Sequence, residues 1–322
     1  MLQDDIQLIR ARLDEAQNIA VYAHIRPDGD SIGSSLALGW ALEDAGKTVQ
    51  YICEDPVPER FSFLYEMCKD GRAPYVREAV NADCYILPDI SDPDRVGRYF
   101  LDRPELIPDI CIDHHLSNKG YAKLNWIESD SPAASCVMAG LLPKLGFTLT
   151  KRISAALLCG IITDTNSFTT VNVNAGCLRS AYELVENGAD IYPISYRGYK
   201  QHTMEEMALW KLGMDNIRIE GDLIWTVIRK KDRDAIGCAD DEDHGFVSYM
   251  VNTKGIMVSV LFMEISENET KISWRSQPGF NVAEVAVAHG GGGHAAASGA
   301  TVYGPIEEQI PLVLAKTKAM LF

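Results

Sequence analysis

The 322-residue sequence lacks the features that define several classes of protein. It has only 14 Pro and 25 Gly and is 47% hydrophobic, which excludes a disordered or collagen-like chain. The longest apolar stretch, residues 154–162, is about half of the roughly eighteen residues that span a membrane. Its first residues are acidic, unlike those of a signal or transit peptide. We therefore expect a cytoplasmic protein with no membrane partner.

Paired cysteines and excess positive charge are also missing. The eight cysteines are scattered singly without a Cys-x-x-Cys motif, which favours buried free thiols over a zinc site or a redox dithiol. The net charge is −15, and residues 1–205 and 206–322 both have more acids than bases. Both halves therefore repel long duplex nucleic acid, whereas a small phosphorylated ligand can still bind with the help of cations.

The pattern of apolar residues predicts two domains. In residues 1–190, apolar runs that suit strands alternate with helical periodicity, which indicates an α/β fold with a mostly parallel sheet flanked by helices. We expect a linker at 191–206 and a smaller α+β domain at 207–322. The expected strands of the first domain are 19–23, 49–53, 83–87 and 106–112, and its expected helices are 3–17, 31–45, 133–146, 150–163 and 175–188.

The predicted second domain has a different pattern. Residues 216–219 and 223–228 flank Glu220-Gly221-Asp222, which is typical of a hairpin. A second hairpin is expected at 258–275, followed by a helix that begins at Val282. These elements predict an α+β domain of about 115 residues, within the usual domain size.

Acidic and imidazole side chains occur where the apolar runs of the first domain end. The carboxyl ends of parallel strands meet at one edge of a sheet, where ligands bind, so we expect these side chains to converge. The segments are His24-x3-Asp28-x-Asp30, Asp89, Asp113-His114-His115 and, at the end of a predicted helix, Asp164.

These residue types point to divalent metal ions. Carboxylates with neutral imidazoles suit Mn²⁺ or Mg²⁺ better than a metal that prefers thiolates. Five aspartates and two or three histidines exceed the needs of one ion, so we predict two ions about 3.5–4 Å apart that share a carboxylate. Water between two such ions becomes a nucleophile near neutral pH, and phosphoester hydrolysis is the natural reaction.

Each segment alone has an ordinary structural explanation. Asp28-Gly29-Asp30 is typical of a turn with a helix N-cap, and Asp89 fits a turn. The adjacent histidines suit a structural pair, and Asp164 suits a helix cap. The order of the segments and their placement at strand ends favour one joint site.

This ordered set resembles the DHH phosphoesterase family. The resemblance lies in His24-x3-Asp28-Gly29-Asp30-Ser31-x-Gly33-Ser34, then Asp89, Asp113-His114-His115 and Asp164-Thr165. The later Arg275-Ser276 and Gly290-Gly291-Gly292-Gly293-His294 resemble the DHH-associated substrate domain of that family. The match spans about residues 18–303 and implies an active site in the cleft between the domains.

The resemblance also implies a role for each matching residue. Asp113 would orient a histidine, and His115 would face the scissile phosphate. The cofactors would be two divalent ions, Mn²⁺ first, with Mg²⁺ or Co²⁺ as alternatives. The implied ligands are His24 and Asp28 for one ion, Asp30, His114 and Asp164 for the other, and Asp89 for both.

A phosphate of the substrate would bind to the second domain. Successive glycines can aim backbone N–H groups at one anion, and Arg275 can bind a phosphate with two hydrogen bonds. A solvated strand residue and a flexible loop are the ordinary alternatives. No Lys or Arg occurs in 276–303, which favours short substrates. The implied binding residues are Arg275, Gly291, Gly292, Gly293 and His294.

The family implies a hydrolase that cleaves short single-stranded RNA of about two to five nucleotides to mononucleotides, and pAp to AMP, with a homodimer as a further expectation. Three alternatives stay open: a phosphodiesterase for cyclic dinucleotides or pApA, a RecJ-like single-strand exonuclease, and a non-catalytic nucleotide sensor. The exonuclease would need basic grooves and stacking aromatics, which this acidic chain lacks. A sensor should have lost a metal ligand, and each one is present. A related inorganic pyrophosphatase is disfavoured by the glycine run.

Overall fold

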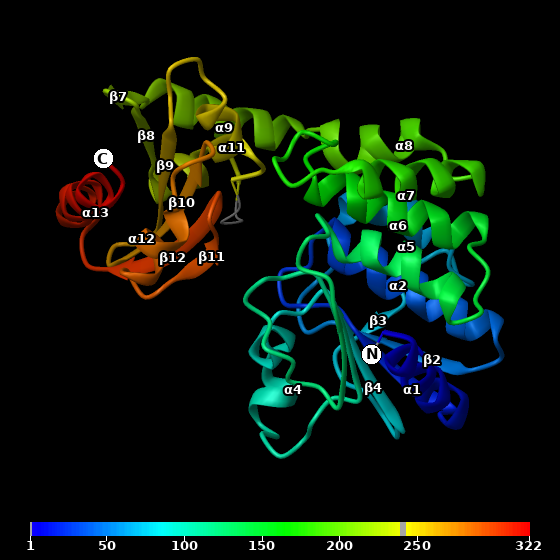
Figure 1. Ribbon diagram of the computed structural model, residues 1–322. Helices are drawn as coiled ribbons and strands as arrows, with labels where there is room; N and C mark the ends of the chain where they lie inside the picture. Colours follow the sequence, from blue (N-terminus) through cyan, green and yellow to red (C-terminus); the bar gives the residue numbers. More distant parts are fainter. Residues whose placement is uncertain (1, 239–242) are drawn as a thin grey trace. The chain divides into compact units, whose positions relative to one another are not determined.

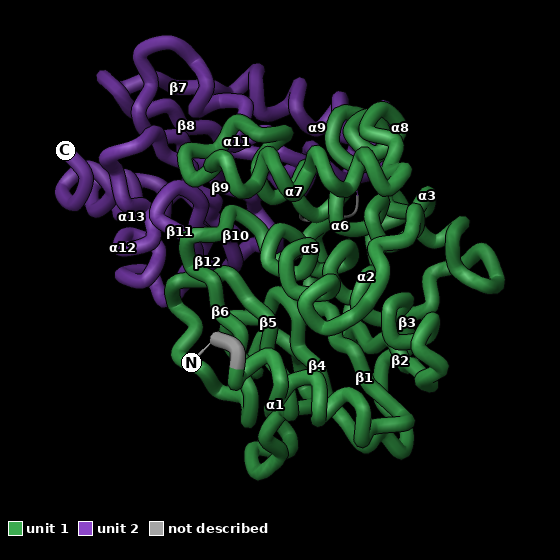
Figure 2. The backbone as a smooth tube through the Cα atoms, turned by 45° about the vertical axis from the view of Figure 1, so that its right-hand side comes forward, with its two compact units in different colours: residues 1–201 green, residues 202–322 purple. Residues whose placement is uncertain are grey.

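The computed structural model describes residues 2–238 and 243–322. The chain divides into two compact units, residues 1–201 (unit 1) and residues 202–322 (unit 2), which Figure 2 shows in different colours. Among the described helices, none combines the length and the apolar character that crossing a bilayer requires.

Unit 1 is built on a six-stranded parallel sheet (Figure 1). The strand order is β3-β2-β1-β4-β5-β6, so the chain runs outward from β1 to β3 and returns to β4 beside β1. Loops that follow β1 and β4 therefore flank the point where the direction of winding reverses, the usual place for a ligand. The strands are β1 (Asn18–Tyr22), β2 (Thr48–Ile52), β3 (Tyr75–Val76), β4 (Cys84–Pro88), β5 (Ile110–Asp113) and β6 (Leu124–Ile127).

Helices and loops cover both faces of this sheet, as the sequence predicts. Strand β1 contributes to both cores: Ile19 and Val21 pack with the helical layer that contains α2, α5 and α6, whereas Ala20 and Tyr22 pack on the opposite side with Phe100 of α4. The helices are α1 (Leu2–Glu15), α2 (Gly29–Asp44), α3 (Ser62–Tyr65), α4 (Arg98–Leu101), α5 (Ala134–Lys144), α6 (Lys151–Asp164), α7 (Ala175–Glu186) and α8 (Ile191–Ser195), followed by a π-helical turn at Tyr196–Lys200.

Two glycines allow α2 and α6 to pack closely. A Cβ atom on Gly33 would lie 2.3 Å from the carbonyl oxygen of Ala156, and one on Gly160 would lie 2.5 Å from Oδ1 of Asp30. The small residues after Asp30 therefore serve helix packing. This packing brings the start of α2, with Asp30, beside the end of α6, with Asp164.

The predicted α/β fold with a mostly parallel sheet is confirmed, with differences at the ends of elements. The strand expected at 106–112 begins only at Ile110, because the N–H of Leu106 donates to Arg103 in a turn and Pro108 has no N–H to offer a sheet. Strand β6 lies in a stretch where no strand was predicted.

Unit 2 is an α+β unit with a mixed sheet in the order β11-β12-β10-β9-β8-β7. The two predicted hairpins are β7–β8 and β9–β10, while β8 and β9 pair in parallel. The strands are β7 (Arg218–Glu220), β8 (Leu223–Ile228), β9 (Val258–Ser266), β10 (Glu269–Ser276), β11 (Gly292–His294) and β12 (Ala297–Tyr303), and the helices are α9 (Met204–Asp215), α10 (Lys230–Ala235), α11 (Phe246–Val251), α12 (Val282–Val287) and α13 (Ile306–Leu321).

The side chains of this sheet alternate between two cores. Trp274 and Val282 belong to the core on the side of α12 and α13, whereas Leu209 and Phe246 belong to the core on the side of α9 and α11. Alternation along β10 therefore places the neighbour of Trp274, Arg275, on the side of α11.

Candidate metal centre and phosphate-binding residues

Four segments of unit 1 bring the six predicted metal ligands together. His24 lies two residues after β1, Asp89 directly follows β4, and His114 directly follows β5. Asp28 is the N-cap of α2, Asp30 lies in the first turn of α2, and Asp164 is the last residue of α6. Three overlapping groups each have their ligand atoms within 4.8 Å of one another, namely His24, Asp28 and Asp89; Asp30, His114 and Asp164; and Asp89, Asp113, His114 and His115.

Asp89 connects the two groups of metal ligands. Its Oδ2 lies 3.6 Å from Nε2 of His24, and its Oδ1 lies 3.5 Å from Nε2 of His114. The same histidine nitrogens lie 3.7 Å from Asp28 Oδ1 and 3.6 Å from Asp164 Oδ2. These separations are longer than good hydrogen bonds but are spacings that two ligands of one ion can take.

The other nitrogen of each histidine is occupied. Nδ1 of His24 donates to the carbonyl of Ile25 at 2.8 Å, and Nδ1 of His114 donates to that of Ser131 at 3.2 Å. Nε2 of each ring therefore faces the carboxylates, and it is the nitrogen that would bind a metal ion.

The surroundings of Asp89 suit a bound cation. The residue is 3% exposed, and its Oδ1 has no hydrogen-bond partner among the described residues. Its backbone is in the left-handed region (φ 57°), and its N–H donates to Ile112 of β5 at 2.9 Å, which fixes the strained conformation. A buried carboxylate oxygen without a donor is costly, and a cation at this place would remove the cost.

Asp28 and Asp30 also have structural roles. Asp28 caps α2, because its Oδ1 accepts the N–H groups of Asp30 and Ser31 at 3.0 Å. The oxygens of Asp30 accept the N–H groups of Ala134 and Ser135 at the start of α5, at 2.6 and 2.9 Å. The capping explanation from the sequence is therefore correct, and it coexists with placement in the cluster.

Crowded carboxylates shift the pKa values of this site. Burial and the charge of Asp89 raise the pKa of Asp30 to about 7. Partial burial and the charge of Asp30 raise the pKa of Asp164 well above its usual range. Burial alone would lower the pKa of His114, but its contact with Asp89 and the charges of the neighbouring carboxylates raise it to about 10. The cluster is therefore short of positive charge, which two divalent ions would supply.

The side chain of Asp113 is paired with the ring of His115. Its fully buried Oδ1 accepts from Nδ1 of His115 and from the backbone N–H of His114, both at 2.8 Å. Asn118, which the sequence did not single out, donates to Oδ2 at 2.6 Å. Burial opposes ionisation, but these hydrogen bonds, led by that of His115, lower the pKa of Asp113. Asp113 is therefore an anion that orients the His115 ring.

In unit 2, Arg275 and His294 lie in one row across the sheet. Arg275 of β10 pairs with Ala297 of β12, which pairs with His294 of β11, so the two side chains share a face about 10 Å apart. The Arg275 guanidinium donates to the hydroxyl of Ser248 at 3.2 Å and to the carbonyl of Trp274 at 2.9 Å. These contacts hold the side chain along the sheet.

Part of the glycine run forms a strand, which differs from the flexible loop that is its ordinary alternative. Gly292 and Gly293 belong to the edge strand β11, and the N–H groups of Gly290 and Gly291 donate to carbonyls of α12. These two N–H groups are therefore already engaged within unit 2. Glycine is needed here for close packing, because a Cβ atom on Gly291 would lie 2.1 Å from the carbonyl oxygen of Gly299.

Comparison with known proteins supports the resemblance seen in the motifs. Residues 18–161 match the DHH family, N-terminal domain, and residues 219–321 match the DHHA1 domain. The bifunctional oligoribonuclease and PAP phosphatase NrnA of Thermus thermophilus is 31% identical over 287 residues, which cover 89% of this chain and 84% of that protein. The protein of the same name from Bacillus subtilis is 26% identical over 88% of this chain and 89% of its own length.

Solved structures show the same fold. An exopolyphosphatase-related protein from Bacteroides fragilis superposes with a TM-score of 0.89 at 23% identity, over 98% of this chain and 96% of that chain. RecJ from Thermus thermophilus in complex with Mn²⁺ gives a TM-score of 0.54 at 15% identity, over 99% of this chain but 54% of that chain. Nearly half of that nuclease therefore has no counterpart in the match.

Proposed function

Because the chain belongs to the DHH family, we propose that it is a metal-dependent phosphoester hydrolase that cleaves short oligoribonucleotides to mononucleotides and pAp to AMP. The observation that carries the proposal is Asp89, whose two oxygens face two separate groups of ligands. The names of the relatives from Thermus thermophilus and Bacillus subtilis support the choice of substrates.

The donor atoms fit two divalent cations. His24 and Asp28 would hold one ion, Asp30, His114 and Asp164 the other, and Asp89 both. Oxygen and imidazole donors without thiolates suit Mn²⁺ first, with Mg²⁺ as an alternative. When bound, such ions supply an activated water and neutralise the charge that develops on the phosphate.

His115 and Asp113 would assist the departure of the leaving group. The buried Asp113 carboxylate fixes the His115 ring through Nδ1, so that Nε2 is the atom that would face the substrate. A protonated Nε2 can donate a proton to the leaving oxygen or a hydrogen bond to the phosphate. The lowered pKa of Asp113 keeps its carboxylate ionised as the partner of the ring.

Unit 2 would hold a second phosphate of the substrate. Arg275 provides a planar set of donors, and His294 lies in the same cross-strand row. A phosphate held by this row would fix the distance between the cleaved bond and the end of the substrate. Such a constraint favours short oligonucleotides over long polyanions.

The test is release of AMP from 5′-pApA by the full-length protein with Mn²⁺, followed by chromatography. We expect rapid release, with EDTA abolishing it. The same assay with pAp and a cyclic dinucleotide ranks the substrates by kcat/KM. Two bound Mn²⁺ ions without turnover of any of the three substrates would contradict the proposal and favour a nucleotide sensor.

A further inference from the structure

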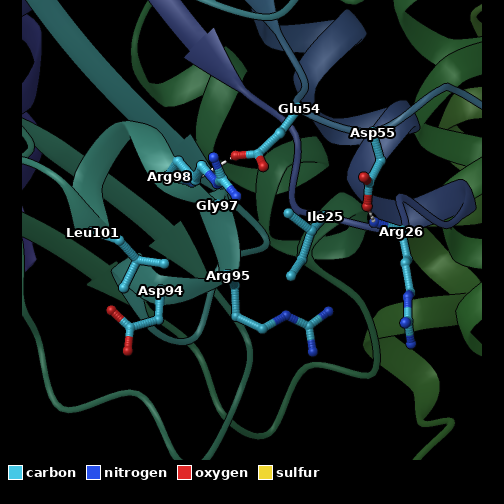
Figure 3. A pocket seen from close by; sticks show the side chains of 9 residues that line it. All are labelled: Ile25, Arg26, Glu54, Asp55, Asp94, Arg95, Gly97, Arg98 and Leu101. Atoms are coloured by element: carbon cyan, nitrogen blue, oxygen red, sulfur yellow. Dashed lines mark hydrogen bonds between the residues drawn. The ribbon is translucent and has the colours of Figure 1, made fainter.

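A pocket in unit 1 adjoins the metal ligand His24 but is not used by the mechanism above. Its volume is about 490 Å³, within the range of small-molecule sites. It is formed by the loops after β1 and β2 and by the segment from the 3-10 turn at Pro93–Val96 into α4 (Figure 3). The lining residues are Ile25, Arg26, Glu54, Asp55, Asp94, Arg95, Gly97, Arg98 and Leu101.

The Arg95 guanidinium lies beside the ring of His24 but does not donate a hydrogen bond to it. Its Nη2 lies 3.3 Å from Nδ1 of His24. When Nε2 of His24 faces the cluster, Nδ1 carries a proton and donates to the carbonyl of Ile25. Two donors cannot bond to each other, so Arg95 keeps its hydrogen-bonding capacity. Among the described residues, no carboxylate lies within ion-pair distance of the guanidinium of Arg95 or Arg26.

Two of the acidic side chains in the pocket bind backbone N–H groups instead. Glu54 accepts from the N–H of Arg98, and Asp55 accepts from the N–H of Arg26 at 2.8 Å. Figure 3 shows these two contacts, with the side chains of Arg26 and Arg95 extending away from both carboxylates. The third acid, Asp94, points away from the Arg95 guanidinium in the same view.

The backbone around the arginines is held in unusual conformations. Arg26 has a φ of 51°, in the left-handed region that costs energy for a residue with a side chain, and its contact with Asp55 maintains it. Gly97 has a φ of 92°, and a Cβ atom there would lie 2.0 Å from Oε2 of Glu54. The same acidic residues that fix the backbone therefore leave the positive side chains available for an anion.

We infer that this pocket binds an additional phosphodiester of the substrate, through Arg26 and Arg95, and so extends the site from dinucleotides to trinucleotides. The inference rests on the proposed function. In pApA, the single phosphodiester would be cleaved at the metal centre and the 5′-phosphate would bind to Arg275. No phosphate is then left for the pocket. The trinucleotide pApApA carries a third phosphate, and the two arginines next to His24 offer it charge-assisted hydrogen bonds.

The test compares kcat/KM for pApApA and pApA in full-length variants with Mn²⁺. Arg95→Ala and Arg26→Ala should each lower kcat/KM for pApApA by about five- to tenfold, with less than a twofold change for pApA. Arg275→Ala should lower both. Arg77→Ala, which removes an exposed arginine outside the pocket, is the matched control and should change neither.

Binding in Ca²⁺, measured by calorimetry, separates this inference from the proposed function. Wild-type protein should bind pApApA more tightly than pApA, and both pocket variants should lose that advantage even if no Ca²⁺-supported turnover occurs. Equal binding of the two ligands, or an advantage that survives both substitutions, would overturn the pocket assignment. Absence of Mn²⁺-dependent cleavage by wild-type protein, with the binding advantage intact, would instead overturn the proposed hydrolysis.

Discussion

The cluster of carboxylates and imidazoles in unit 1 and the row of Arg275 and His294 in unit 2 differ in how they place charge. Unit 1 buries Asp30 and Asp89 beside the half-exposed Asp28, so that negative charge is concentrated in one buried place. Unit 2 presents Arg275 and His294 along a sheet, where solvent reaches them. The buried cluster depends on each of its members, whereas contacts at a wetter surface contribute separately.

This comparison makes different predictions for the two regions. Changes in the cluster should remove catalysis as a whole, since the proposed ligands would hold shared ions. Changes in the row of unit 2 should weaken binding in steps and leave the chemical step intact.

Replacement of the shared carboxylate should have the largest effect. Asp89→Ala removes the one side chain that faces both ligand groups, so turnover of pApA should fall by at least about 10³-fold and bound Mn²⁺ should fall below two per chain. Steady-state kinetics and metal analysis after dialysis measure both quantities. Asp102→Ala, at an exposed carboxylate of unit 1, is the control. A near-wild-type rate for Asp89→Ala would contradict the assignment of Asp89 as a ligand shared by two ions.

The pair of Asp113 and His115 should affect the rate without affecting the metals. His115→Ala should lower kcat about 10²- to 10³-fold, and Asp113→Asn should lower it by a similar factor because the ring loses the negative charge of its acceptor. Two Mn²⁺ ions should remain bound in both variants. Loss of an ion from His115→Ala would show instead that this histidine is a metal ligand.

Arg275→Ala should change binding rather than chemistry. We expect KM for pApA to rise about tenfold with kcat within twofold of wild type, because a charge-assisted contact to the second phosphate is lost. Lys254→Ala, at an exposed residue of unit 2, should leave both constants unchanged. If KM for Arg275→Ala equals that of wild type, Arg275 is an ordinary strand residue.

The smallest effect concerns the stability of the metal-free protein. A carboxyl whose pKa is raised by folding destabilises the fold once it ionises, and for Asp30 this penalty develops between about pH 4 and its folded pKa of about 7. Asp30→Asn abolishes that contribution. The Tm of the variant minus the Tm of wild type should therefore be larger at pH 8 than at pH 5, by roughly 2–5 °C. Thermal unfolding in EDTA at both pH values measures it, and a Tm difference independent of pH would contradict the assigned repulsion.

Much of unit 1 could be predicted because its signals are local. Apolar runs mark β1, β2 and β4, and each of the segments that carry the ligands stands next to such a run or to a helix. Parallel strands bring their carboxyl ends to one edge, so the linear order of His24, Asp89 and Asp113 was enough to predict that they meet.

The errors arose where distant residues decide the outcome. Four successive glycines do not indicate a strand, but pairing with β12 makes Gly292 and Gly293 part of an edge strand, and the N–H groups of Gly290 and Gly291 donate to carbonyls of α12. The sequence around Asn118 does not indicate its role, because that role depends on a hydrogen bond to the buried Asp113. The pocket beside His24 also depends on contacts between separate loops.

The sequence by itself determined the types and order of the chemical groups: carboxylates and imidazoles at the ends of apolar runs in one half, and an arginine followed by glycines and a histidine in the other. Only the tertiary structure decided that Asp89 presents its two oxygens to His24 and His114, and that Asp113 binds His115. The physical reason is that periodicity reflects burial along one segment, whereas ligand geometry depends on backbone angles and packing between segments far apart in the chain. Gly33 and Gly160 illustrate this, because their close packing joins the start of α2 to the end of α6.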